Sequence, residues 1–153
     1  MKFNSYLYNN EALASIALGY FLKKQGIISI AKVLLVLPFV LHEPTVKKLK
    51  CQSFKRSLEE FILKHPECLL NFNGRFLDFL PLAINALTLL NAMKVIRIKR
   101  DMICFNYDSS FFHEYPKNIG ARANNMFPAI DVLYELMQDQ NINSFYLKLK
   151  IEL

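Results

Sequence analysis

The sequence has no tryptophan, only four glycines and only three cysteines among its 153 residues. So little glycine argues against a glycine-rich phosphate-binding loop and against a β-barrel with many tight turns. Cys51, Cys68 and Cys104 are odd in number and have no CxxC spacing, so the sequence indicates neither a disulfide framework nor a zinc site. We therefore expect no cofactor, and free thiols fit a reducing, cytoplasmic compartment.

Groupings of residues that carry out catalysis are also missing. His42, His65 and His113 are isolated, and none lies four residues from another histidine, as a metal-binding helix requires. Glu59 and Glu60 are adjacent, so on a helix they point about 100° apart and cannot face each other as an acid–base pair. The sequence therefore predicts a protein that is not an enzyme, with no catalytic, cofactor-binding or metal-binding residues.

No apolar run is long enough for a membrane span of about 20 residues. The stretch 27–41 is short and contains Lys32, while 77–93 is interrupted by Asp78 and Asn85. The N-terminus also has no apolar core of the kind found in signal peptides. We expect a cytoplasmic protein that does not associate with membranes.

Apolar residues make up 53% of the chain and charged residues 21%, which departs from the usual shares of roughly 45–50% and 25%. A chain of this length has room for one domain with a substantial core. Thirteen phenylalanines and seven tyrosines suit a helical core, and we expect part of the apolar excess to face a partner. The net charge of +6 leaves an acidic partner, nucleic acid and a solvated basic surface open.

The N-terminal part, about 9–51, predicts a helical hairpin. Asn9 or Asn10 can cap a first helix, which ends near Gly26, a residue that readily adopts the left-handed conformation at a helix end. Ser29 can cap a second helix over 30–41, which Pro38 should kink or end early. Pro44 then opens a short basic helix.

The middle part, about 53–107, predicts a winged-helix-like unit. Ser57 to Glu60 has the spacing of a capping box, 68–74 is predicted to be a loop, and 75–92 a long helix. Apolar residues then alternate with polar ones over 95–106 on both sides of a turn, which indicates a β-hairpin.

The C-terminal part, about 120–153, predicts a helix over 121–138 and a β-strand over 145–153 that joins the hairpin. The expected fold is therefore a single, mostly α-helical α+β domain over 1–153, with a winged-helix-like helix plus hairpin and a C-terminal strand.

Cations gather at the junction between the long helix and the hairpin. We expect phosphate contacts from four residues there: Lys94, Arg97, Lys99 and Arg100. The preceding segment 82–90 offers only Asn85 and Thr88 as polar side chains, so base-specific reading is not expected. A second basic cluster, which suits an acidic partner or a solvated helix end, consists of Lys47, Lys48, Lys50, Lys55 and Arg56.

Several short motifs between about residues 5 and 98 resemble one bacterial family. They are Tyr8-Asn-Asn-Glu11, Ala12-Leu-Ala-Ser-Ile-Ala17, Leu41-His-Glu-Pro-Thr45, Ser57-Leu-Glu-Glu-Phe61, Asn71-Phe-Asn-Gly-Arg75 and Leu80-Pro-Leu-Ala-Ile-Asn85. The pattern is similar to the middle component of three-component ABC systems. The resemblance implies a non-enzymatic adaptor between an SMC- or recombination-like ABC ATPase and a third component, both encoded by neighbouring genes, in conflict with phage or other mobile elements.

We expect such an adaptor to bind its partners through the N-terminal helical hairpin. The partner-binding residues would be Tyr8, Asn9, Asn10, Glu11, His42, Glu43, Pro44 and Thr45. The competing hypothesis is an independent winged-helix nucleic-acid-binding protein or transcriptional regulator. On the adaptor hypothesis, the isolated chain makes at most weak, sequence-independent contact with nucleic acid.

Overall fold

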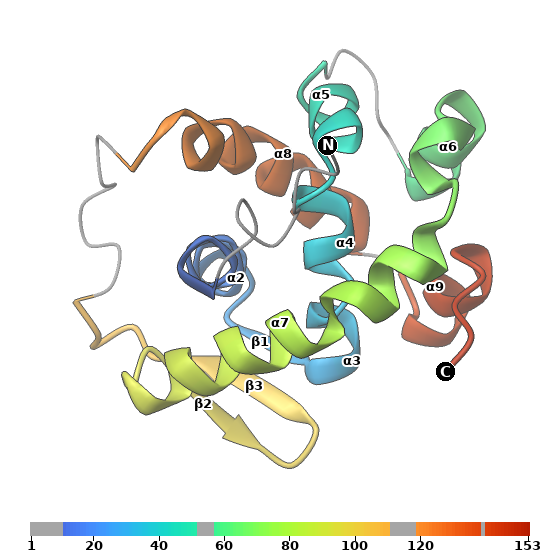
Figure 1. Cartoon of the computed structure of the whole chain (residues 1–153). Helices are drawn as coiled ribbons and strands as arrows, with labels where there is room; N and C mark the ends of the chain where they lie inside the picture. Colours follow the sequence, from blue (N-terminus) through green and yellow to red (C-terminus); the bar gives the residue numbers. More distant parts are fainter. Residues whose placement is uncertain (1–10, 52–56, 111–118, 139) are drawn as a thin grey trace.

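The computed structural model describes residues 11–51, 57–110, 119–138 and 140–153. Within these ranges the elements, in chain order, are α2 (Glu11–Gln25), β1 (Ile27–Ser29), α3 (Ile30–Val33), α4 (Val36–Val40), α5 (Glu43–Lys50), α6 (Leu58–Lys64), the 3-10 helix η1 (Pro66–Leu69), α7 (Phe72–Ala92), β2 (Ile96–Lys99), β3 (Met102–Phe105), α8 (Ala121–Met137) and α9 (Ile142–Lys148). Figure 1 shows a small antiparallel sheet at the lower edge of the molecule, with most of the helices on one side of it. The predicted mostly helical α+β domain is confirmed.

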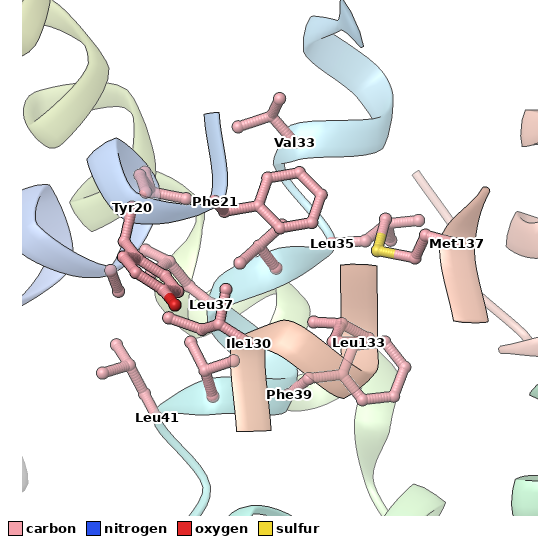
Figure 2. Close-up of a cluster of buried hydrophobic side chains, with 14 of the residues drawn as sticks. Tyr20, Phe21, Val33, Leu35, Leu37, Phe39, Leu41, Ile130, Leu133 and Met137 are labelled. Atoms are coloured by element: carbon pink, nitrogen blue, oxygen red, sulfur yellow. The ribbon is translucent and has the colours of Figure 1, made fainter. Parts of the chain in front are cut away.

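Helix α2 lies in the middle of the molecule, packed against α7 and α8 (Figure 1). Nearly every side chain from Ala14 to Leu22 is buried, as expected of a helix that is apolar around its whole circumference. Figure 2 shows Phe21 of α2 among Leu37 of α4 and Leu133 of α8. We expected partner binding through the N-terminal helical hairpin, but these apolar side chains of α2 fill the chain's own core.

The predicted helix 30–41 is split into α3 and α4 by a turn at Leu34 and Leu35. Pro38 explains the break, because it has no N–H to donate to the carbonyl of Leu34 and its ring crowds that same carbonyl. The predicted effect of Pro38 is confirmed. Ser29 caps α3 as expected, with its Oγ accepting from the backbone N–H of Lys32 at 3.4 Å.

The predicted hairpin is also confirmed. Strands β2 and β3 pair antiparallel, with Ile96 opposite Phe105 and Lys99 opposite Met102. The strand order β1-β3-β2 makes β2 an edge strand that directly follows the long helix α7. Assignment of this unit to the winged-helix class stays a prediction.

The predicted C-terminal strand 145–153 is wrong, because residues Ile142–Lys148 form helix α9. Phe145 and Leu149, four residues apart, are buried, whereas Leu147 between them is 78% exposed. That is the spacing of a helix, and the apparent alternation of apolar residues was a coincidence of sequence. The third strand of the sheet is instead β1, which pairs with β3 through Ile28 opposite Ile103.

The predicted loop 68–74 is wrong in its second half, because α7 already begins at Phe72. Asn71 precedes it with a left-handed backbone (φ 55°), and its side chain lies over Gly74, where a Cβ would collide with the Asn71 amide. Gly74 is therefore part of the first helical turn. Lys55 and Arg56 of the second basic cluster lie outside the described residues.

Candidate interaction surfaces

The joint between α4 and α5 contains a chain of hydrogen bonds. Arg75 Nη1 lies 3.3 Å from His42 Nε2, and His42 Nδ1 lies 2.7 Å from Thr45 Oγ1. Arginine can only donate, so Nε2 must accept and the proton of the neutral imidazole must be on Nδ1. His42 therefore donates to Thr45, which in turn hydrogen-bonds the buried thiol of Cys68.

Arg75 also holds the start of α7 against the preceding turn. Its Nη2 donates to the carbonyl of Cys68 at 2.5 Å and its Nη1 to that of Leu70 at 3.0 Å, while the guanidinium lies 5.4 Å from the centre of the Phe72 ring. Burial lowers the pKa of Arg75. The two motifs around His42 and Arg75, 33 positions apart in the chain, thus meet in one network.

This network makes stability depend on pH. Burial lowers the pKa of His42, and the positive charge of Arg75 lowers it further. The unfolded chain then binds a proton near pH 6.5 while the folded chain does not, so stability is complete above about pH 6.5 and falls as pH decreases toward the folded pKa. We expect the free energy of unfolding to fall by up to about 1.4 kcal/mol per pH unit in that window.

Urea titrations at pH 7.5, 6.5 and 5.5 measure this loss, and an H42N variant is the comparison because it cannot titrate there. Equal pH dependence in the wild-type protein and in H42N would contradict the assignment of the effect to His42.

The predicted partner-binding residues differ in exposure. Glu11, Glu43 and Pro44 are exposed, His42 is half-buried, and Thr45 is fully buried within the network. Tyr8, Asn9 and Asn10 lie outside the described residues. Thr45 therefore serves the fold, and partner binding by the exposed members stays a prediction. His42 stands at the N-cap position of α5, but its side chain bonds Thr45 Oγ1 and no backbone N–H.

A cleft of about 340 Å³ lies between α5 and α8 beside this joint. Its lining consists of Val40, Leu41, Glu43, Val46, Arg122, Asn125 and Met126. Arg122 Nη2 donates to the carbonyl of Leu41 at 3.4 Å, and Lys50 Nζ donates to Asn125 Oδ1 at 2.6 Å across the gap. Glu43 at the rim pairs with Lys47 at 3.3 Å, so this cleft has mixed charge.

Sequence reasoning missed the outer face of α7. We define the α7 stripe as Leu77, Pro81, Ile84 and Thr88, which recur at helical spacing and are all exposed. Leu77 is 46% and Ile84 52% exposed. Thr88 donates its hydroxyl to the carbonyl of Ile84 at 2.8 Å, so that its polar group is already satisfied. The signal was present in the sequence, because this 21-residue helix has only two charged residues, Arg75 and Asp78.

The four cations predicted to contact phosphate are exposed and lie on the β2–β3 hairpin and at its base. Arg97 and Lys99 project from one face of β2, opposite Cys104 and Met102 of β3. No acid among the described residues forms an ion pair with any of the four. Their charge is therefore not neutralised within the described part of the chain.

Lys94 and Arg100, at the two ends of β2, both have left-handed backbones, with φ of 59° and 55°. Lys94 follows α7 in a Schellman motif, in which its own N–H bonds the carbonyl of Asn91 and the next N–H bonds that of Leu90. Glycine is preferred at both kinds of position. Cations at strained positions are a reason to look for a function.

We expect K94G to stabilise the protein by about 0.5–1 kcal/mol, since relief of left-handed strain outweighs the added backbone entropy of the unfolded glycine. The matched control is K99G at the end of the exposed strand β2, where the backbone is extended and glycine should destabilise by a similar amount. Urea unfolding of both variants measures the difference. A destabilised K94G variant would contradict the strain argument.

The described residues contain no group of three or more histidine, cysteine or acidic side chains placed to hold a metal ion. Cys51, Cys68 and Cys104 are free thiols, and burial raises the pKa of Cys68. Of the described helices, none combines the length and apolar character needed to cross a bilayer.

Comparison with known families gives one match. The family model described as ABC-three component (ABC-3C) system Middle Component 3 (MC3) aligns with residues 2–153. No curated protein and no solved structure matches the chain significantly.

Proposed function

Because the chain belongs to the Middle Component 3 family of ABC-three component systems, we propose that it is a non-enzymatic adaptor that joins the ABC ATPase of such a system to the third component. The family makes it one component of a multi-part system. The adaptor role, and a purpose in defence against phages or other mobile elements, are our proposals.

The exposed α7 stripe carries this proposal. Leu77 and Ile84 are each about half exposed on a helix whose outer face has one charged residue, Asp78. Charged residues are depleted at the centres of protein interfaces, and contiguous apolar patches on a monomer commonly mark binding sites. The core offers no alternative role for these side chains, because the opposite face of α7 already packs on α2 and α4.

Co-expression with the products of neighbouring genes tests the adaptor role. We expect an assembly that elutes as one complex in size-exclusion chromatography and contains the ATPase, this chain and the third component. Omission of this chain should separate the other two. A chain that stays monomeric and binds neither product would refute the proposal.

Nucleic-acid binding by the hairpin is the second candidate function. The cations, which have no ion-pair partner among the described residues, favour it. The long helix α7 followed by the β2–β3 hairpin, with β1 completing the strand order β1-β3-β2, supports a winged-helix arrangement. The apolar outer face of α7 argues against it. The Thr88 hydroxyl already donates to the carbonyl of Ile84, so Asn85 is the main polar side chain left on this helix to contact bases. Binding by the isolated chain is therefore expected to be weak and independent of sequence.

Affinity for duplex DNA across a salt series separates the two candidates. Each phosphate contact contributes about 0.9 to the slope of log affinity against log salt, so an R97A/K99A/R100A variant should lose up to about 2.7 units of slope if all three bind phosphate. Equal, weak binding by the wild type and the variant would show that the hairpin makes no phosphate contact. Tight binding that the variant loses would make nucleic acid the leading function.

A further inference from the structure

The basic hairpin lies beside the C-terminal end of the α7 stripe. Asn91, in the last turn of α7, accepts a hydrogen bond through Oδ1 from the backbone N–H of Ile98 on β2 at 3.3 Å. In Figure 1 the hairpin folds back beneath α7. Ile98 is 37% exposed on the face of β2 that also carries the buried Ile96, whereas Arg97 and Lys99 project from the other face.

The hairpin beside the stripe carries mostly positive charge. Lys94, Arg97, Lys99 and Arg100 are exposed and have no ion-pair partner among the described residues. The acid nearest to them in sequence is Asp101, whose backbone carbonyl accepts from the N–H of Ile30 and so ties the hairpin tip to α3. A complementary partner therefore presents apolar side chains to the stripe and carboxylates to the hairpin.

We propose that the α7 stripe and the hairpin together bind an amphipathic, acidic helix of a partner component, an inference that rests on the adaptor function proposed above. The stripe from Leu77 to Thr88 extends about 16 Å along the α7 axis, roughly three helical turns, and helix-on-helix packing buries such a stripe efficiently. The apolar face of the partner helix lies on Leu77, Pro81 and Ile84. Its acidic residues pair with Arg97 and Lys99 on the edge strand β2.

Addition of a partner strand to β2 is less consistent with the structure. An added strand needs the outward-facing N–H groups of the edge strand. At Ile98 that group is already bound by the Asn91 side chain. A nucleic-acid duplex is also a poor match, because it would cover the apolar stripe without offering apolar groups to it.

The test uses the complex reconstituted from the full-length chain and the co-expressed neighbouring gene products. Carbodiimide joins amines to carboxylates in direct contact, so we expect cross-links from Lys94 and Lys99 to aspartates or glutamates three or four residues apart in one partner segment. Cross-links at these lysines that scatter over non-helical loops of the partner, or none at all in an intact complex, would overturn the proposal.

Charge reversal provides a matched pair of variants. Lys94 and Lys150 are both exposed, both have left-handed backbones and both follow a helix in a Schellman motif, but Lys150 is at the end of α9. We expect K94E to weaken the complex about 10-fold and R97E/K99E about 100-fold, with K150E within about twofold of the wild type. Thermal unfolding checks that each variant is folded.

The outcomes distinguish this proposal from the adaptor function. If an L77S/I84S variant weakens the complex while R97E/K99E leaves it unchanged, the adaptor function stands and the acidic helix is refuted. If no wild-type complex forms at all, both fail. If R97E/K99E abolishes duplex DNA binding and leaves partner binding intact, the cations belong to nucleic acid, which also refutes the acidic helix.

Discussion

Replacing Arg75 with methionine is expected to lower the free energy of unfolding by about 3 kcal/mol, which corresponds to roughly 6–12 °C in melting temperature for a chain of this size. Methionine keeps the apolar stem but removes every donor. The carbonyls of Cys68 and Leu70 and the Nε2 of His42 would each lose a partner. Hydrogen bonds to charged donors are worth about 1.5–3 kcal/mol each, and partial exposure of the site reduces their sum.

Chemical denaturation of R75M and R75K measures the effect. Lysine keeps the charge but has no planar fork to reach two carbonyls, so R75K should lie between R75M and the wild type. R97M is the control, since Arg97 is exposed on β2 and its replacement should change stability by less than about 0.5 kcal/mol. An R75M variant as stable as R97M would contradict a structural role for the network.

Replacing Leu77 and Ile84 together with serine is expected to weaken the partner complex about 30-fold, or about 2 kcal/mol. Both side chains are about half exposed in the monomer, so an interface has that remaining apolar area to bury. Stability of the isolated chain should change much less than the affinity. Calorimetric titration of the purified partner with the variant measures the loss.

The matched control is L63S/L147S. Leu63 on α6 and Leu147 on α9 are more exposed than the stripe residues but lie on other helices. If the control weakens the complex as much as the stripe variant, then general apolar exposure, and not the α7 stripe, determines binding.

The sequence predicted correctly the helix ends and turns that depend on neighbouring residues. The end of the first helix at Gly26, the break caused by Pro38 and the turn between β2 and β3 depend on residues close together in sequence, and all three are confirmed. The segment 145–153 was mispredicted because alternating apolar residues also satisfy helical spacing when only Phe145 and Leu149 are buried. Whether this segment forms a helix or a strand depends on the elements that it packs against.

The candidate surfaces depend more strongly on tertiary structure. Their four cations were visible in the sequence, but the position of the hairpin beside the α7 stripe follows from the contact between Asn91 and Ile98. The pairing of His42 with Arg75 likewise joins segments that no local pattern connects. Exposure of Leu77 and Ile84 was hidden because apolar residues on a helix are normally assigned to a core.

The central position of α2 has a consequence for synthesis on the ribosome. Helix α2 leaves the ribosome before α8, which covers it and is complete only roughly 110 residues later, on the order of ten seconds at typical elongation rates. During that interval the core that buries the side chains from Ala14 to Leu22 is incomplete. The nascent chain therefore exposes apolar side chains to which chaperones can bind. Its yield should depend on translation speed more than the yield of a protein whose early helices lie at the surface.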